Sequence, residues 1–342
     1  MFRTALRAVL PTAAAAALTT AALAPAQAED AKAFFKGKTI TITVPYGAGG
    51  GYDTYARLLA PHFAKFLDAT VIVQNKPGGS GMIGVNEVYA GKKDGTDLVF
   101  YQGTSIAANQ LIGVKNARYD LMKMKHIATV AWSPWILLAS PKSGINSLED
   151  IKSFSRPINF GGNGPSSADT SGGRAVCMAL RLKCKHIIGY GGSREASLAM
   201  TRGEVDAYYV SDSSAFRYVK AGAAKPIAVV SKTKSIFFPE VKSIFDLAKI
   251  DERGQWIIGF HNRLEKIGRI LSAPPGVPAD RVAVLRKMAK DILTDPKFVA
   301  EAKAKKRDIL FSSGKETEEN VKQILSINPE RKKLASQVIQ GK

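Results

Sequence analysis

The strongest constraint on the fold is a regular alternation of short runs rich in Thr, Ile and Val with amphipathic helical segments. The first unit is a predicted strand at residues 38–45, followed by a glycine-rich turn and a predicted helix at 53–67. Further strands are predicted at 70–74, 97–102, 135–140, 158–160 and 227–231. This alternation is typical of an α/β protein whose sheets are mostly parallel and flanked by helices.

Helices are predicted between these strands and again towards the end of the chain. The apolar spacing indicates internal helices at 82–90, 171–182, 195–202 and 214–221. From Pro278 onward it predicts two or three amphipathic helices, around 281–293, 296–306 and 315–325. Ligands of open α/β sheets bind at the loops that follow the carboxyl ends of strands. The glycine-rich strand-to-helix turns are therefore the candidate binding positions.

The first residues have the composition of an export signal. Arg3 and Arg7 precede an Ala- and Leu-rich stretch at residues 8–23, and the Ala-Gln-Ala at 26–28 fits the small-x-small cleavage rule. Cleavage after Ala28 would leave 342 − 28 = 314 residues. An uncleaved membrane anchor is the alternative, but the apolar run is short and rich in Ala and Thr. We therefore expect a signal peptide at residues 1–28 and a freely diffusing periplasmic protein.

Length and charge narrow the function. A mature chain of this size can bury a substantial core, and two lobes are the natural expectation. The formal net charge is +20, or 20 − 2 = +18 without Arg3 and Arg7. Such an excess fits an anionic partner. The basic residues are scattered through predicted helices, and the densest cluster, at residues 303–307, is expected to be a solvated face. We therefore expect no nucleic-acid binding.

The two cysteines leave two alternatives. An oxidising compartment favours a disulfide between Cys177 and Cys184. On one continuous helix their Cα atoms would lie about 10 Å apart, which is too far for a bond. A bridge becomes feasible if the helix ends near Leu182 and the chain turns back. Two buried thiols are the other interpretation, and the sequence alone does not decide between them.

The turn at residues 45–53 carries the strongest local signal. Its glycines remove side-chain bulk so that backbone N–H groups can approach an anion, and the following helix adds its positive end. Asp53 is placed to cap that helix or to meet a polar group of a ligand. The segment is not a phosphate-binding Walker loop, because Lys32 stands where the upstream glycine of Gly37-Lys38-Thr39 is required. A plain tight turn is the alternative.

Two further glycine clusters also precede predicted helices. The first, at residues 75–84, is interpreted mainly as a turn that shapes the domain. The second, at 161–170, adds hydroxyl and amide groups. Neutral donors of this kind can hold a carboxylate without the desolvation cost of a buried cation. The second cluster is therefore a candidate for the other side of a binding site.

Taken in order, these segments resemble the receptor components of tripartite tricarboxylate transporters, also called Bug proteins. The resemblance covers nearly the whole mature chain. It is carried by VPYGAGGGYD, VIVQNKPGGSGMIG, KKDGTDL, GGNGPSS, IGYGGSREASLAMTRGEVDA and SAPPGVPADRVAVLRKMAKDIL. It implies a two-lobe Venus-flytrap fold of the type II kind that closes around a small carboxylate. We expect lobe 1 at residues 31–134 plus 256–342, and lobe 2 at 135–255.

The resemblance also implies which residues bind the ligand. The turn of lobe 1 would bind one carboxylate through backbone N–H groups, with an acidic residue closing the motif and a hydroxyl from a second loop. These positions are Tyr46, Gly47, Ala48, Gly49, Gly50, Asp53 and Ser105. The matching positions of lobe 2 are Asn163, Ser166, Ser167, Tyr190 and Ser193.

Lobe 2 departs from the family pattern. Where the family often has a histidine, this chain has Ala168, Asp169 and Thr170, and we count Asp169 and Thr170 among the candidate ligand-binding residues. Gly191 replaces the lysine of a Tyr-Lys-Gly-Gly loop, and residues 210–213 read Val-Ser-Asp-Ser instead of carrying Asp-Asn. Lobe 2 then has few fixed cations, so we expect citrate-like tricarboxylates to bind poorly.

Two tryptophans flank the segment where the chain is expected to cross between the lobes. Trp132 and Trp135 surround Ser133 and Pro134. Aromatic rings beside a cleft can stack on a ligand, and packing at a hinge is an equally good interpretation. We include Ser133 and Trp135 among the candidate ligand-binding residues. A mono- or dicarboxylate with an apolar or aromatic body is the expected ligand.

Catalysis is not expected. Enzymes need a nucleophile with a base, or metal ligands, and the four histidines are scattered without ligand spacing. We expect no cofactor and no metal, and a monomeric protein that delivers its ligand to membrane permease subunits. A ligand-loaded sensor that docks on a signalling receptor is the rival interpretation, and a secreted hydrolase on the same fold is a distant third.

Overall fold

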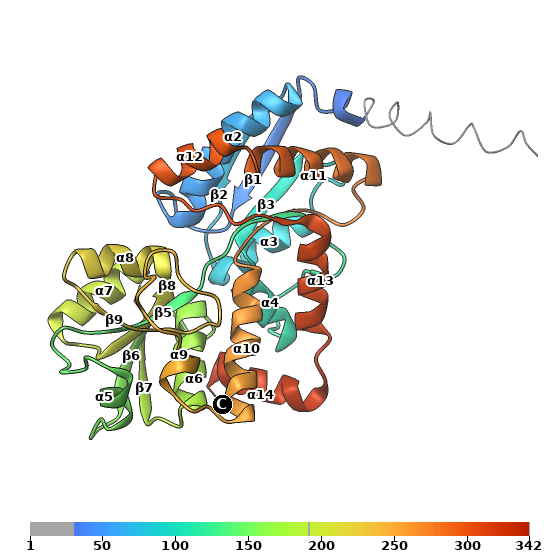
Figure 1. Ribbon diagram of the computed structural model, residues 1–342. Coiled ribbons are helices and arrows are strands. Elements are labelled where there is room, and N and C mark those ends of the chain that lie inside the picture. Colours follow the sequence, from blue (N-terminus) through green and yellow to red (C-terminus); the bar gives the residue numbers. More distant parts are fainter. Residues whose placement is uncertain (1–30, 191, 342) are drawn as a thin grey trace, which may run out of the picture.

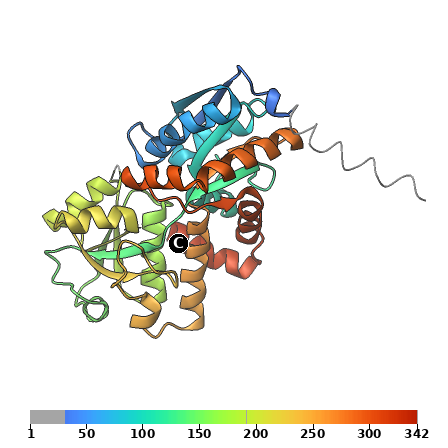
Figure 2. The same ribbon diagram turned by 45° about the horizontal axis from the view of Figure 1, so that its top comes forward.

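Two β-sheets, each flanked by helices, organise the chain in a computed structural model that describes residues 31–190 and 192–341 (Figure 1). The predicted signal peptide at residues 1–28 lies outside the described residues, as does Gly191. The two sheets form two lobes that remain distinct in the turned view (Figure 2). No helix within the described part of the chain has the length and apolar character needed to cross a membrane.

The first sheet has six strands in the order β11-β4-β10-β3-β1-β2. Its strands are β1 (Thr39–Val44), β2 (Thr70–Asn75), β3 (Asp97–Gln102), β4 (Lys125–Ala131), β10 (Arg269–Ala273) and β11 (Ser312–Ser313). Its helices are α2 (Gly51–Leu67), α3 (Met82–Tyr89), α4 (Gly103–Leu111), α11 (Ala279–Leu293), α12 (Pro296–Ala304) and α13 (Gly314–Leu325), with a 3-10 turn, η1 (Gly79–Gly81), before α3.

The second sheet has five strands in the order β7-β6-β8-β5-β9. Its strands are β5 (Trp135–Ala139), β6 (Ile158–Gly162), β7 (Cys184–Ile188), β8 (Ala207–Ser211) and β9 (Lys225–Val229). Its helices are α5 (Leu148–Lys152), α6 (Ala168–Ala179), α7 (Ser193–Arg202), α8 (Asp212–Lys220) and α9 (Ile244–Leu247).

Both sheets are mixed, which refines the prediction of mostly parallel sheets. In the first sheet β1, β2, β3 and β4 run in one direction, while β10 and β11 run in the other. In the second sheet β5 alone opposes β6, β7, β8 and β9. The reversed strands β5 and β10 are those that enter a sheet directly after the chain has crossed from the other lobe. At each crossing the chain enters the new sheet at the edge where the parallel strands of that sheet end. The entering strand therefore runs antiparallel to its neighbours.

Two helices connect the lobes. Helix α10 (Glu252–Lys266) contacts α6 of the second lobe as well as α4 and α13 of the first. Helix α14 (Pro329–Gln340), which the sequence did not predict, contacts α6 and α10. Figure 1 shows α10 standing between the two sheets with α14 at its lower end. The predicted boundary at 255/256 therefore falls inside a connecting helix, and the lobe limits remain a proposal.

Successive residues of a strand point to opposite faces of the sheet. Because helices cover both faces, the central strands are apolar at almost every position. In β3, Leu98 and Phe100 join one core cluster, while Val99 and Tyr101 join the cluster on the other face. The same alternation divides β5 between two clusters in the second lobe. Burial on both faces fixes the register of these strands.

The structure decides between the two interpretations of the cysteines. Helix α6 ends at Ala179, a turn follows, and β7 begins at Cys184. The turn brings the two Cα atoms to 6.3 Å, and a disulfide joins Cys177 to Cys184. Of the two interpretations the disulfide is the one that holds, and it links the end of a helix to the next strand.

Candidate ligand-binding site

The carboxyl edges of the two sheets face each other. The last residue of β4, Ala131, is followed after only three residues by Trp135, the first residue of β5. Trp135 pairs with Ser211 at the end of β8, and Arg269 at the start of β10 pairs with both Ala131 and Gln102, the last residue of β3. This short crossing holds the ends of β3 and β4 next to the end of β8, so the strand-to-helix turns of the two lobes meet there.

Helices that begin at these edges have no side-chain cap. The N-cap residues of α2, α4, α6, α7 and α8 make no capping hydrogen bond through their side chains. By contrast, α5, α10 and α13, which begin elsewhere, are capped by Ser147, Asp251 and Ser313. Helix α11 also has no cap, and it begins at the opposite edge. Uncapped helix ends carry positive charge and N–H groups that suit an anion, although the N–H groups of Thr170 in α6 and Ser213 in α8 already donate to Asp169 and Asp212.

The turn before α2 is shaped by Asp53. Gly49 donates its backbone N–H to Oδ2 of Asp53 at 2.8 Å, and Nε of Arg57 donates to Oδ1 at 2.9 Å. Burial raises the pKa of the Asp53 carboxyl, but the hydrogen bonds from Arg57, Gly49 and Asn75 outweigh it and hold that pKa below its usual value. The Asp53 carboxylate is therefore ionised, and its oxygens accept hydrogen bonds from Gly49 and Arg57. Residues 47–51 of the turn are exposed.

Tyr46 and Ser105 both attach to the end of β3. The backbone N–H of Gln102 donates to the Tyr46 hydroxyl at 3.1 Å, and the Tyr46 ring packs at 4.7 Å against that of Tyr52. Ser105 is buried and donates its hydroxyl to Oε1 of Gln102 at 2.8 Å. Tyr46 thus links the two loops of lobe 1, while Ser105 holds the side chain of Gln102 within its own loop.

The predicted turn of lobe 2 uses an aspartate in a similar way. Oδ2 of Asp169 accepts the backbone N–H of Asn163 at 3.0 Å and the Tyr208 hydroxyl at 3.0 Å. Burial raises the pKa of Asp169, although its hydrogen bonds oppose the shift. Thr170 is fully buried, and its hydroxyl lies 2.9 Å from that of Ser167. Asp169 and Thr170 therefore support the turn from inside the lobe.

The remaining predicted residues of lobe 2 lie nearer the surface. Asn163 is exposed, and Ser166 and Tyr190 are half-buried. Burial raises the pKa of the Tyr190 hydroxyl. Ser193 begins α7, and its hydroxyl accepts a hydrogen bond from Tyr218 at 2.8 Å. Asn163 is therefore the most accessible of the predicted residues of this lobe, and Ser166, Ser167, Tyr190 and Ser193 are partly accessible.

Ser133 connects the crossing to an aspartate that was not among the predicted site residues. Asp212 begins α8, is almost fully buried, and accepts hydrogen bonds from the hydroxyls of Ser235 and Ser133. Its backbone N–H donates to the carbonyl of Pro134 at 3.1 Å. Burial raises the pKa of Asp212 to about 6, against the lowering effect of Ser235, the Ser213 N–H and Ser133. Lobe 2 thus places a proton-binding group beside the crossing.

Trp135 packs within the connection between the lobes. Its ring stacks on Tyr209 at 5.0 Å and meets His261 edge-on at 6.5 Å. Glu265 lies nearby, and burial raises the pKa of its carboxyl well above the ordinary value. These contacts favour the hinge-packing interpretation of Trp135, and Trp132 is half-buried. Contact between either ring and a ligand stays a prediction.

Sequence reasoning missed a cation in lobe 1. Arg269 begins β10 at the facing edge, where its guanidinium lies 5.5 Å from the ring centre of Tyr52 and 4.8 Å from that of Tyr55. Its Nε is buried and has no hydrogen-bond partner. The sequence signal was a single arginine opening an apolar run at residues 269–273, and it is recognisable only once the pairing of that run is known.

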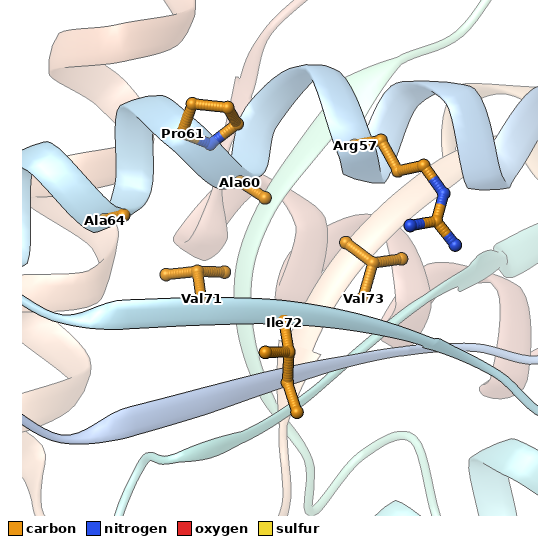
Figure 3. Close-up of a pocket in the computed structure, with 7 residues that line it drawn as sticks. All are labelled: Arg57, Ala60, Pro61, Ala64, Val71, Ile72 and Val73. Atoms are coloured by element: carbon orange, nitrogen blue, oxygen red, sulfur yellow. The ribbon is translucent and has the colours of Figure 1, made fainter.

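Two open hollows border α2. A cavity of about 510 Å³ lies between α2 and β2, and Figure 3 shows Val71 and Val73 pointing towards the helix while Ile72 points away. Apart from Arg57, which is hydrogen-bonded to Asp53 and Asn75, its lining is apolar. A smaller one of about 290 Å³ is bordered by Thr54, Arg57, Leu58, Lys305 and Arg307. Within residues 31–190 and 192–341, no cluster of His, Cys, Asp and Glu could hold a metal ion.

Solved structures share this fold. MatC from Rhodopseudomonas palustris with bound malate has a TM-score of 0.70 at 19% identity, covering 87% of this chain and 98% of that one. Rpa4515 from R. palustris with adipate has a TM-score of 0.71 at 17% identity, covering 88% and 97%. At these identities the likeness establishes the two-lobe α/β architecture of a periplasmic binding protein.

Sequence comparison identifies the family. A UPF0065 protein of Bordetella pertussis is 27% identical over 270 residues, which cover 78% of this chain and 79% of the relative. Residues 55–325 match the family described as tripartite tricarboxylate transporter family receptor. The chain therefore belongs to the tripartite tricarboxylate transporter receptor family, whose members are substrate-binding proteins of the periplasm and not enzymes.

Proposed function

We propose that this protein captures a small mono- or dicarboxylate with an apolar or aromatic body and delivers it to a tripartite tricarboxylate-type permease. The observation that carries the proposal is the group of uncapped helix N-termini at two facing sheet edges. Free N–H groups and positive helix ends stabilise a carboxylate without a buried cation at the anchor. The protein acts in the periplasm after removal of its signal peptide, and it binds as a monomer.

The ligand's first carboxylate binds the turn at residues 46–50 and the first turn of α2. This turn is exposed and rich in glycine, and Gly50 gives α2 no side-chain cap. Asn163 and Ser166 contribute neutral donors from the opposite lobe. The malate and adipate bound by the two proteins of the same fold are both dicarboxylates, and they support this ligand class.

A thermal-shift panel tests the proposal. Mature protein, residues 29–342, is heated with hexanoate, adipate, benzoate or citrate. A ligand that binds only the folded state stabilises it by about 2.7 kcal/mol at a hundredfold excess over the Kd. We expect adipate or one of the monocarboxylates to raise the melting temperature and citrate to have little effect. Failure of all the mono- and dicarboxylates, or a response to citrate alone, would contradict the proposed ligand class.

A further inference from the structure

Arg269 lies at the edge of the first sheet where the chain crosses to lobe 2. In the sheet Arg269 pairs with Gln102 at the end of β3 and with Ala131 at the end of β4. Because β4 leads into the crossing at residues 132–134, this end of β10 belongs to the edge that faces lobe 2. Arg269 is thus the first residue of β10, and β10 begins at the edge of lobe 1 that faces lobe 2.

The guanidinium of Arg269 lies against the helix that follows the glycine turn. It faces the rings of Tyr52 and Tyr55, which both come from the first turns of α2. The hydroxyl of Tyr52 donates to the carbonyl of Gly268 at 3.0 Å, which ties the start of α2 to the start of β10. A fixed cation therefore stands near the helix end that we propose as the anchor of the first carboxylate.

Arg269 has no anionic partner in the described part of the chain. Its Nε is buried without a hydrogen-bond acceptor, and no carboxylate lies within 4.0 Å of its guanidinium nitrogens to form an ion pair. Asp212, Asp308 and Glu265 influence it electrostatically from farther away. The side chain is half-buried, and a buried guanidinium nitrogen without an acceptor is costly, because it has lost water and gained no partner. The missing partner has the chemistry of an anion.

We propose that Arg269 binds a second anionic group of the ligand and so makes the site selective for dicarboxylates over monocarboxylates. This inference rests on the proposed function, because it needs the first carboxylate at the turn before α2. A guanidinium presents parallel N–H donors that match both oxygens of one carboxylate. The cation that the second lobe lacks is supplied by the first lobe.

An alternative use of Arg269 predicts a different result. Asp212 of lobe 2 is one of the acidic groups that influence Arg269. If the two formed an ion pair when the lobes close, Arg269 would promote closure around any ligand. Its removal would then weaken mono- and dicarboxylates equally. Selective loss of dicarboxylate binding is the property that separates a ligand contact from a closure contact.

Calorimetry with a matched pair of ligands tests the proposal. Adipate and hexanoate have six carbons each and differ by one carboxylate, and both are titrated into wild type, Arg269→Gln and Arg269→Lys. We expect Arg269→Gln to weaken adipate at least about tenfold and hexanoate less than about threefold, which corresponds to a difference of more than about half a kcal/mol. Arg269→Lys should keep part of the preference, because it keeps the charge but loses the paired donors.

Arg307→Gln is the matched control. It removes one positive charge from the same neighbourhood, where the Arg307 guanidinium donates to the Thr54 hydroxyl at 3.0 Å. We expect it to change both affinities by a similar small factor. Equal weakening of both ligands by Arg269→Gln, or no weakening of adipate, would overturn the proposal. If wild type bound neither ligand, the proposed function itself would fail, so the wild-type titration separates the two failures.

Discussion

Gly49 and Asp53 form a closed loop at the start of α2, in which the Gly49 N–H donates to Oδ2 of Asp53 at 2.8 Å. The bond runs from the turn into the first turn of the helix and fixes how the neighbouring N–H groups point. It also uses the Gly49 N–H within the protein, so the ligand must bind the other N–H groups of this segment. We therefore propose that Asp53 positions the anion site and does not touch the anion.

The first prediction concerns this positioning role. Asp53→Asn removes the negative charge that holds both Gly49 and Arg57, so the turn should loosen. We expect the unfolding free energy to fall by about 1–2 kcal/mol, and carboxylate affinity to fall roughly tenfold. Arg57→Gln is the control, because it leaves the bond between Gly49 and Asp53 in place and should cost less affinity. Unchanged adipate binding by folded Asp53→Asn would count against the role.

The second prediction concerns access to the turn. A Cβ atom at Gly47 would meet no heavy atom within 4 Å, whereas Gly49 has a φ of +74°, which strains any other residue. Gly47→Val should therefore fold normally and obstruct an approaching carboxylate. We expect at least a roughly tenfold loss of affinity with little change in melting temperature. Gly47→Ala should give a smaller loss, and a normal titration of Gly47→Val would place the anion elsewhere.

The third prediction is a pH dependence of stability from Asp212. Burial raises the pKa of Asp212 to about 6 in the folded protein, against about 3.9 for an unfolded chain. Because the folded state binds this proton more tightly, the Asp212 contribution to stability falls as pH rises from about 4 to about 6 and is constant above that range. Asp212→Asn removes this dependence.

The expected size follows from the shift. Relative to wild type, Asp212→Asn should gain up to about 3 kcal/mol of unfolding free energy between pH 4 and pH 7. Urea unfolding of both proteins at pH 4, 5, 6, 7 and 8 measures it. If the stability difference between wild type and Asp212→Asn were the same at every pH, the pKa of Asp212 would not be raised in the folded protein.

The fourth prediction concerns the disulfide between Cys177 and Cys184, which closes a loop across a sequence separation of 7. A loop of this size gains about 2.5 kcal/mol from the entropy of the unfolded chain. We expect the double variant Cys177→Ser, Cys184→Ser to lose roughly this amount. Reductant should lower the melting temperature of wild type and leave the variant unchanged. Two titratable thiols in unreduced, unfolded protein would contradict the assignment.

Much of the fold was predictable because its signals are local. The first predicted strand and the helix after the glycine turn correspond to β1 and α2, since both follow from short-range apolar patterns. Among the elements that were not predicted are β4, β7, β8 and β10 and the helices α4, α10 and α14. The strand β10 lies between β3 and β4 only because the chain returns from lobe 2, and such long-range pairing leaves no local pattern.

The candidate site was predictable in its loops but less so in its side chains. The turn at residues 45–53 lies where the sequence placed it, at the end of β1. Asp169 and Thr170 were predicted to contact the ligand, and this stays a prediction; both are buried, and Asp169 accepts a hydrogen bond from Tyr208 of β8. Arg269 was overlooked because the sequence does not show that a residue far along the chain faces the start of α2.

A crystal structure of the mature protein with adipate tests the central claim most directly. One carboxylate should accept hydrogen bonds from backbone N–H groups of residues 47–52, without direct contact to the ionised carboxylate of Asp53, because like charges in a closed cleft repel. The other carboxylate should lie on Arg269. Adipate bound away from the facing sheet edges, or a ligand carboxylate hydrogen-bonded to ionised Asp53, would contradict the account.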